Sequence, residues 1–137
     1  MYKRQQNSNR QNRVSRSSKG GFKEALIDKQ VLVIHAAIAD KLIAANEKGD
    51  SIYLEQIQNT LDNRRDSGRM RYGEYLTWLS VLEVIDDSVA FKNAILEDSH
   101  QMKKYRRRTP LVGILTEAER QRAIEENAVG SIDKALF

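Results

Sequence analysis

The sequence contains no cysteine, a single proline, two histidines and one tryptophan. Without cysteine the chain has no disulfide, no thiolate metal ligand and no cysteine nucleophile, and it suits a reducing compartment such as the cytoplasm. It has no run of roughly 18 uncharged apolar residues, so we expect no membrane-spanning helix and no membrane partner. Gln, Asn and Ser follow the basic N-terminus, which argues against a secretory signal. An organelle transit peptide would need an apolar face that this segment lacks.

The sequence also lacks a recognisable set of catalytic or metal-binding residues. His35 and His100 are far apart in the chain, and neither has neighbours that make up a convincing metal site. The acidic pairs Glu97–Asp98 and Glu125–Glu126 are adjacent in sequence, so on a helix the two carboxylates of each pair point apart. No glycine-rich loop lies between a strand and a helix to hold a phosphate group. We therefore expect no catalytic residue, no metal, no cofactor and no enzymatic activity.

What the sequence does have is a strong charge asymmetry. The first 23 residues contain seven Lys and Arg and no acid, whereas the rest has 16 basic and 19 acidic residues. The net charge of +4 therefore divides into +7 on an N-terminal arm and −3 on the body. Residues 1–21 are too polar to bury enough surface to offset the entropy of ordering, which predicts a disordered arm. Its candidate phosphate contacts are Arg4, Arg10, Arg13, Arg16 and Lys19.

Residues 22–48 carry apolar side chains at spacings of three and four, which predicts a helix. Between Val31 and Ala45 this helix would be apolar almost all round, as is typical of a helix buried on most sides. We therefore expect it to be the central helix and to contribute to a homodimer interface. A short strand at Val31–Ile34 is the alternative, but no partner strand is evident elsewhere in the sequence.

Further helices are expected over residues 52–63, 69–85, 88–97 and 116–127. In the second of these, the spacing places Tyr72, Tyr75 and Leu76 on the apolar face and Glu74 on the solvent face. In the last, Thr116 and Glu119 have the spacing of a capping box.

The expected fold class is all-α. We predict a small irregular four- to five-helix domain over residues 22–128 with a disordered basic N-terminal arm, and a loose C-terminal tail over residues 129–137.

Two more basic clusters lie in the predicted body. One is a segment expected to form a loop before Pro110, with Lys103, Lys104, Arg106, Arg107 and Arg108 around Tyr105, which could stack on a base. Alternatively, this loop faces solvent and binds no partner. The other cluster is Arg64, Arg65, Arg69 and Arg71, around the turn between two predicted helices. A helix-turn-helix would make Arg69 and Arg71 readers of bases or phosphates, whereas ordinary surface charge is the simpler interpretation.

These features predict a small nucleic-acid-binding protein with a regulatory or accessory role. DNA is slightly favoured over RNA as the partner, because the sequence predicts a helical body and no aromatic β-platform for stacking unpaired bases. The arm would contact phosphates without reading sequence, because a flexible segment has no fixed geometry. The alternative function is a non-enzymatic helical adaptor whose basic arm docks on an acidic protein.

Overall fold

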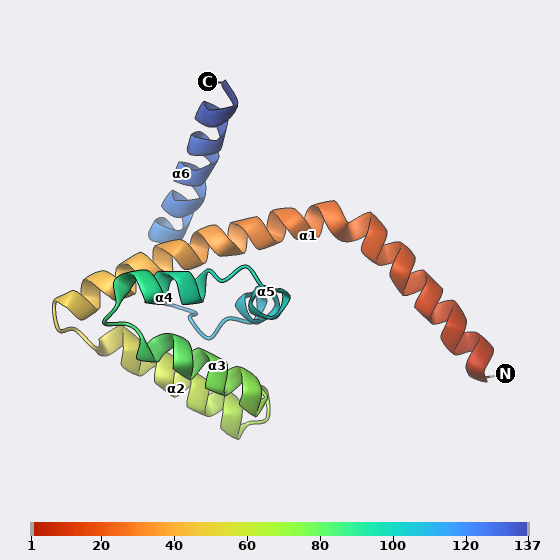
Figure 1. Cartoon of the computed structure of the whole chain (residues 1–137), viewed down its shortest axis with the longest axis horizontal. Coiled ribbons are helices and arrows are strands. Elements are labelled where there is room, and N and C mark those ends of the chain that lie inside the picture. Colours follow the sequence, from red (N-terminus) through yellow and green to blue (C-terminus); the bar gives the residue numbers. More distant parts are fainter. Residues whose placement is uncertain (1, 137) are drawn as a thin grey trace.

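The structure is a computed structural model that describes the backbone of residues 2–136 and the side chains of residues 21–127. Over the described backbone the chain forms six α-helices and no strand, so the prediction of an all-helical protein is confirmed (Figure 1). The helices are α1 (Tyr2–Glu47), α2 (Ile52–Asp66), α3 (Tyr72–Glu83), α4 (Ser88–Ile95), α5 (His100–Arg107) and α6 (Glu117–Leu136).

Helix α1 is central, as the sequence predicts, and it contacts α2, α4, α5 and α6. Its buried residues Ile38, Ala39 and Leu42 are part of one core to which α2, α4 and α5 also contribute. The backbone of α1 extends back to Tyr2, but the side chains of residues 1–20 and 128–137 lie outside the described part of the chain. The disordered arm and the loose C-terminal tail therefore stay predictions.

Helices α2 and α3 run antiparallel and contact each other (Figure 1). The turn between them contains Gly68, whose φ of 76° lies in the left-handed region that favours glycine. Helix α3 also contacts α4, so it has neighbours on two sides.

The buried face of α3 differs from the predicted one. Tyr75, Trp78 and Val81 are buried together with Glu74, whereas Tyr72 and Leu76 are exposed. The prediction that Glu74 faces solvent is wrong. Its carboxylate is buried because it accepts a hydrogen bond from the Arg108 guanidinium at 2.9 Å, and apolar spacing within one helix gives no sign of this distant partner.

The segment predicted as a basic loop is helix α5. Ser99 caps it, accepting a hydrogen bond from the backbone N–H of Met102 at 3.1 Å. Met102 and Arg106 lie one turn apart on the buried face of the helix, and the helix stops at Arg107, shortly before Pro110. The loop prediction was wrong because two buried side chains, Met102 and the aliphatic part of Arg106, are enough to pack this short helix against the body.

The capping box predicted at the start of α6 is present. The backbone N–H of Glu119 donates to Thr116 Oγ1 at 3.1 Å, and the backbone N–H of Thr116 donates to Glu119 Oε1 at 2.9 Å. Lys41 of α1 also donates to Glu119 Oε1 at 2.7 Å. The hydrogen bond from Lys41 is the main reason that the pKa of Glu119 is lowered to about 2. The start of α6 is thereby fixed to the central helix.

Candidate nucleic-acid interface

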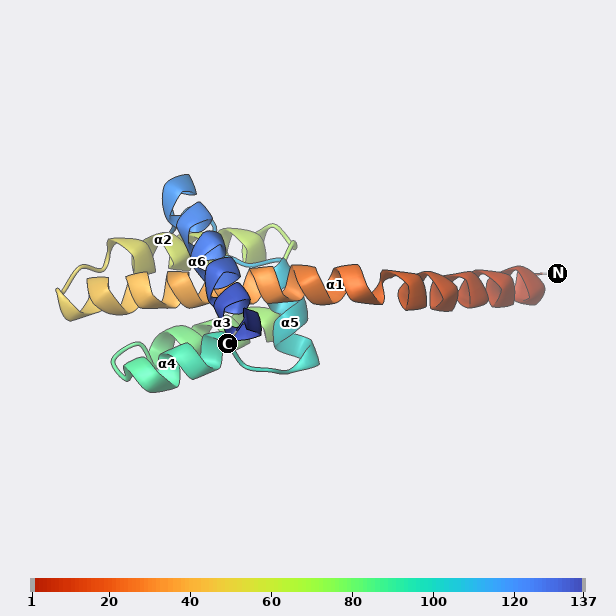
Figure 2. The same ribbon diagram turned by 90° about the horizontal axis from the view of Figure 1, so that it is seen from above.

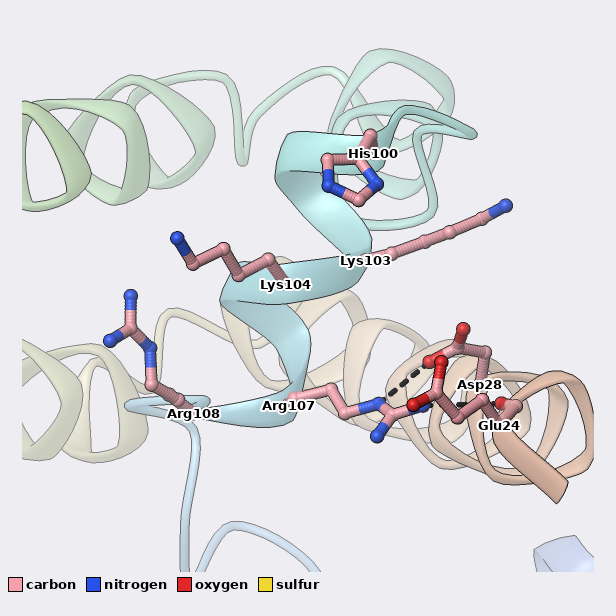
Figure 3. A pocket seen from close by; sticks show the side chains of 7 residues that line it. All are labelled: Glu24, Asp28, His100, Lys103, Lys104, Arg107 and Arg108. Atoms are coloured by element: carbon pink, nitrogen blue, oxygen red, sulfur yellow. Dashed lines mark hydrogen bonds and ion pairs between the residues drawn. The ribbon is translucent and has the colours of Figure 1, made fainter. Parts of the chain in front are cut away.

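The exposed face of α5 borders an open hollow of about 620 Å³ between α5 and the middle of α1 (Figure 3). Positions separated by three, four and seven residues share one face of a helix, and here they carry His100, Lys103, Lys104 and Arg107. The hollow is lined by these four residues and by Arg108, Glu24 and Asp28.

Most of these cations already have a partner within the protein. Arg107 Nε donates to Asp28 Oδ1 at 2.8 Å, and its Nη2 donates to the backbone carbonyl oxygen of Glu24 at 3.2 Å. Lys103 lies 3.2 Å from a carboxylate oxygen of Asp98. Arg108 pairs with the buried Glu74 of α3. The positive charge of the hollow is therefore partly compensated, which its sequence does not indicate.

Lys104 is the exception among the Lys and Arg side chains that line the hollow. It is exposed, and it forms no ion pair with a side chain in residues 21–127. In Figure 3 it points away from Asp28 and Glu24. An incoming anion therefore meets Lys104 without first displacing a carboxylate.

Two residues of the α5 cluster face inward. Arg106 is buried, and its Nη1 donates to the backbone carbonyl oxygens of Ile95 at 2.9 Å and Glu97 at 3.0 Å, at the C-terminal end of α4. Burial lowers the pKa of its guanidinium, although an arginine stays charged at neutral pH. Tyr105 is half-buried against the core. The Arg106 guanidinium therefore presents no open surface to a phosphate, and only part of Tyr105 is accessible to a base.

The four arginines around the α2–α3 turn are placed differently from one another. Arg64 Nη1 donates to the backbone carbonyl oxygens of Arg108 at 2.7 Å and Thr109 at 3.0 Å, which joins α2 to the end of α5. The guanidinium of Arg65 lies over the Tyr75 ring, 4.5 Å from its centroid. Arg69 and Arg71 are exposed, and neither pairs with an acidic side chain in residues 21–127.

The antiparallel course of α2 and α3 differs from a helix-turn-helix, in which the two helices cross at about 90–120° (Figures 1 and 2). The exposed face of α3 also begins with Tyr72 and Leu76, which offer few groups for reading base edges. Arg69 and Arg71 are therefore better placed to contact phosphates than to read a base sequence.

The basic segments lie together although they are far apart in sequence. In both views, α5, the α2–α3 turn and the N-terminal part of α1 are at the same end of the body (Figures 1 and 2). The contacts of Arg64 and Arg107 join these three segments directly. Side chains of the arm itself lie outside the described residues, so Arg4, Arg10, Arg13, Arg16 and Lys19 are placed only by their helix.

Sequence reasoning missed the acidic members of the site. Glu24 and Asp28 come immediately after the acid-free arm, one helical turn apart, and that spacing was the available signal. Glu74 gave no such signal, since its partner Arg108 is distant in the chain.

No family model, no curated protein and no solved structure matches this chain. Within the described residues, no helix is both long and apolar enough to cross a membrane. The same part of the chain holds no group of three or more side chains able to bind a metal ion. Function is therefore inferred from the site alone.

Proposed function

We propose that this protein binds nucleic acid without catalysing a reaction and serves a regulatory or accessory role in the cytoplasm. The observation that carries the proposal is the meeting of two basic clusters, on α5 and around the α2–α3 turn, at one end of the body, next to the helix that continues into the basic arm. Cations gathered from distant parts of a chain onto one surface repel one another, and a polyanion relieves that repulsion. Nucleic acid supplies closely spaced phosphates along a surface of this size.

The arm and the body would have different tasks. Arg4, Arg10, Arg13, Arg16 and Lys19 would contact phosphates interchangeably, which strengthens binding to every sequence. Lys103, Lys104, Arg69 and Arg71 are anchored to helices, so they can fix the orientation of the nucleic acid. Arg64, Arg65, Tyr105 and Arg106 would support this surface, because their polar or aromatic groups already contact other groups of the protein.

DNA is favoured over RNA as the partner. The cations of the body are held on short helices of a packed domain, which suits the regular spacing of phosphates on a duplex. The described residues form no strand, and unpaired RNA is commonly bound on a β-sheet by stacked aromatic side chains. The exposed Tyr72 is available for such stacking, but no second exposed aromatic ring lies beside it among residues 21–127.

The proposal includes a homodimer, which would use the exposed part of helix 22–48. Ile38, Ala39 and Leu42 are buried within one copy of the chain, so they have no surface left for a second. Phe22, Leu26 and Ile27 are 77%, 53% and 45% exposed. An apolar stripe of this kind on a helix surface is typical of a contact with another protein.

A titration with short duplex DNA, single-stranded RNA and heparin at two salt concentrations tests the proposed function. We expect duplex DNA to bind most tightly and its affinity to fall steeply as salt increases, because binding releases counterions from the phosphates. Binding to heparin with no binding to either nucleic acid would instead indicate a nonspecific cationic tail, and the proposal would be withdrawn.

The alternative function is a helical adaptor with an acidic protein partner. The exposed Phe22, Leu26 and Ile27 also suit an adaptor, in which they would contact a protein partner in place of a second copy of the chain. An adaptor would leave duplex DNA unbound at physiological salt. The same titration therefore separates the two functions.

A further inference from the structure

The pair formed by Arg107 and Asp28 lies at the boundary between the body and the basic arm. Arg107 is the last residue of α5, and Asp28 belongs to α1 a few residues after the arm ends. Both side chains are about one-third exposed, so neither is sealed inside the protein and water reaches both. Figure 3 shows the Arg107 guanidinium turned toward α1 and away from Lys104.

Asp28 and the Glu24 carbonyl oxygen occupy two of the three nitrogens of the Arg107 guanidinium. They use the Nε–Nη2 edge of the guanidinium, which is one of the two edges by which an arginine binds a phosphate bidentately, and they leave only the Nη1–Nη2 edge open. A carboxylate held on a neighbouring helix acts at a high effective concentration, so a single free phosphate group competes poorly with it. A phosphate beside Asp28 is also repelled by the carboxylate charge.

From this geometry we infer that Asp28 acts as an internal competitor for phosphate and makes the α5 site selective for extended polyanions. The inference rests on the proposed nucleic-acid function and names the residue that sets its selectivity. A duplex first meets Lys104, which has no acidic partner among the described side chains. The duplex also meets Lys103, whose partner Asp98 is almost fully exposed and easily exchanged.

Further contacts along the same polyanion then hold a phosphate beside Arg107 and allow it to replace Asp28. An isolated phosphate has no such additional contacts. The site therefore distinguishes a nucleic acid from inorganic phosphate by length, without reading a base. Arg107 contributes less to binding in the parent protein than its charge suggests. The free energy that it gains from a phosphate is offset by the loss of its ion pair with Asp28.

The test is Asp28→Asn in the full chain, with Asp40→Asn as the matched control. Asp40 is also on α1 and also forms an ion pair of 2.8 Å, with Lys92 of α4, so both substitutions remove one negative charge and one ion pair. Duplex DNA and inorganic phosphate are the two probes. We expect Asp28→Asn to steepen the log–log salt dependence for DNA by about one unit, which reduces affinity about threefold more between roughly 50 and 200 mM salt.

Asp28→Asn should also strengthen the binding of inorganic phosphate, whereas Asp40→Asn should change neither measurement. Arg107→Gln provides a second measurement, and it should weaken DNA binding more in the Asp28→Asn protein than in the parent. Equal effects of Asp28→Asn and Asp40→Asn would show a general charge effect and overturn the inference. If the parent binds DNA and Asp28→Asn changes nothing, the inference fails while the proposed function stands. If the parent and Asp28→Asn both fail to bind DNA, the proposed function itself fails.

Discussion

His35 Nε2 accepts a hydrogen bond from the Thr109 hydroxyl at 2.9 Å, which joins the middle of α1 to the segment that follows α5. The other ring nitrogen, Nδ1, lies 2.8 Å from the carbonyl oxygen of Val31. A carbonyl only accepts, so Nδ1 carries the proton and Nε2 is the acceptor in the neutral ring. Burial lowers the pKa of His35 from 6.5 to about 4.

This histidine should make the fold sensitive to mild acid. The unfolded chain binds a proton at His35 near pH 6.5, whereas the folded chain resists until about pH 4. The free energy of unfolding is therefore unaffected by this group above pH 6.5 and falls as the pH decreases from 6.5 to 4. The full decrease is on the order of 3 kcal/mol.

Urea unfolding at several pH values between 4 and 7 measures this decrease. A His35→Gln variant should show a flatter pH dependence over that range. His100→Gln is the matched control, because it removes the other histidine of the chain, whose side chain is exposed. An equally steep fall in the His35→Gln variant would assign the acid sensitivity to other groups.

Arg106 should be needed for folding and not for binding. Its guanidinium satisfies the carbonyl oxygens of Ile95 and Glu97, which would otherwise have no partner at the end of α4. Arg106→Met keeps the apolar stem but removes both hydrogen bonds, and we expect it to lower the free energy of unfolding by about 2–4 kcal/mol. Lys104→Met, on the exposed face of the same helix, should change stability by less than about 0.5 kcal/mol.

Chemical denaturation of the two variants, followed by circular dichroism, makes this comparison. Equal stability of Arg106→Met and the parent would contradict the structural role of Arg106. Replacing Arg106, Arg107 and Arg108 together would be uninformative about binding, because it would also remove the support of α4 and the partner of the buried Glu74.

The arm should contribute to affinity through charge alone. Arg10, Arg13 and Arg16 replaced by Gln should flatten the log–log salt dependence of DNA binding by about one unit for each phosphate that the arm no longer neutralises. The reduction should be the same for unrelated duplex sequences, because binding to phosphates carries no sequence information. Lys48→Gln, directly after the C-terminal end of α1 and away from the α5 hollow, controls for net charge. A reduction confined to one duplex sequence would contradict this role of the arm.

Helix existence could be predicted from the sequence where many apolar residues repeat, as in the central helix, and where local capping is strong, as at Thr116 and Glu119. Helix faces were harder to predict. Exposed Tyr72 and buried Glu74 exchange their expected places: the core packs around Tyr75, Trp78 and Val81, and Glu74 beside them is paired with Arg108, a residue distant in sequence. Periodicity contains no information about such a partner.

The basic clusters show the same limit of prediction from sequence. Sequence alone locates cations, but it does not show which of them are already bound within the protein. Arg64 and Arg106 donate to backbone carbonyl oxygens, and Arg107 pairs with Asp28, so their charge is used before any partner arrives. Only the fold distinguishes these arginines from Lys104, Arg69 and Arg71. Counting Lys and Arg therefore overestimates the surface available to a polyanion.

Self-association should depend on the exposed apolar stripe of α1. Leu26→Glu places a charge in the middle of this stripe, which an interface would have to bury at high cost. We expect the variant to be a monomer at tens of micromolar in sedimentation equilibrium, where the parent forms a dimer. Ile52→Glu is the matched control, because Ile52 is a similarly exposed apolar residue on α2, away from the stripe. A parent protein that sediments as a monomer, or equal dissociation by both substitutions, would contradict a dimer built on α1.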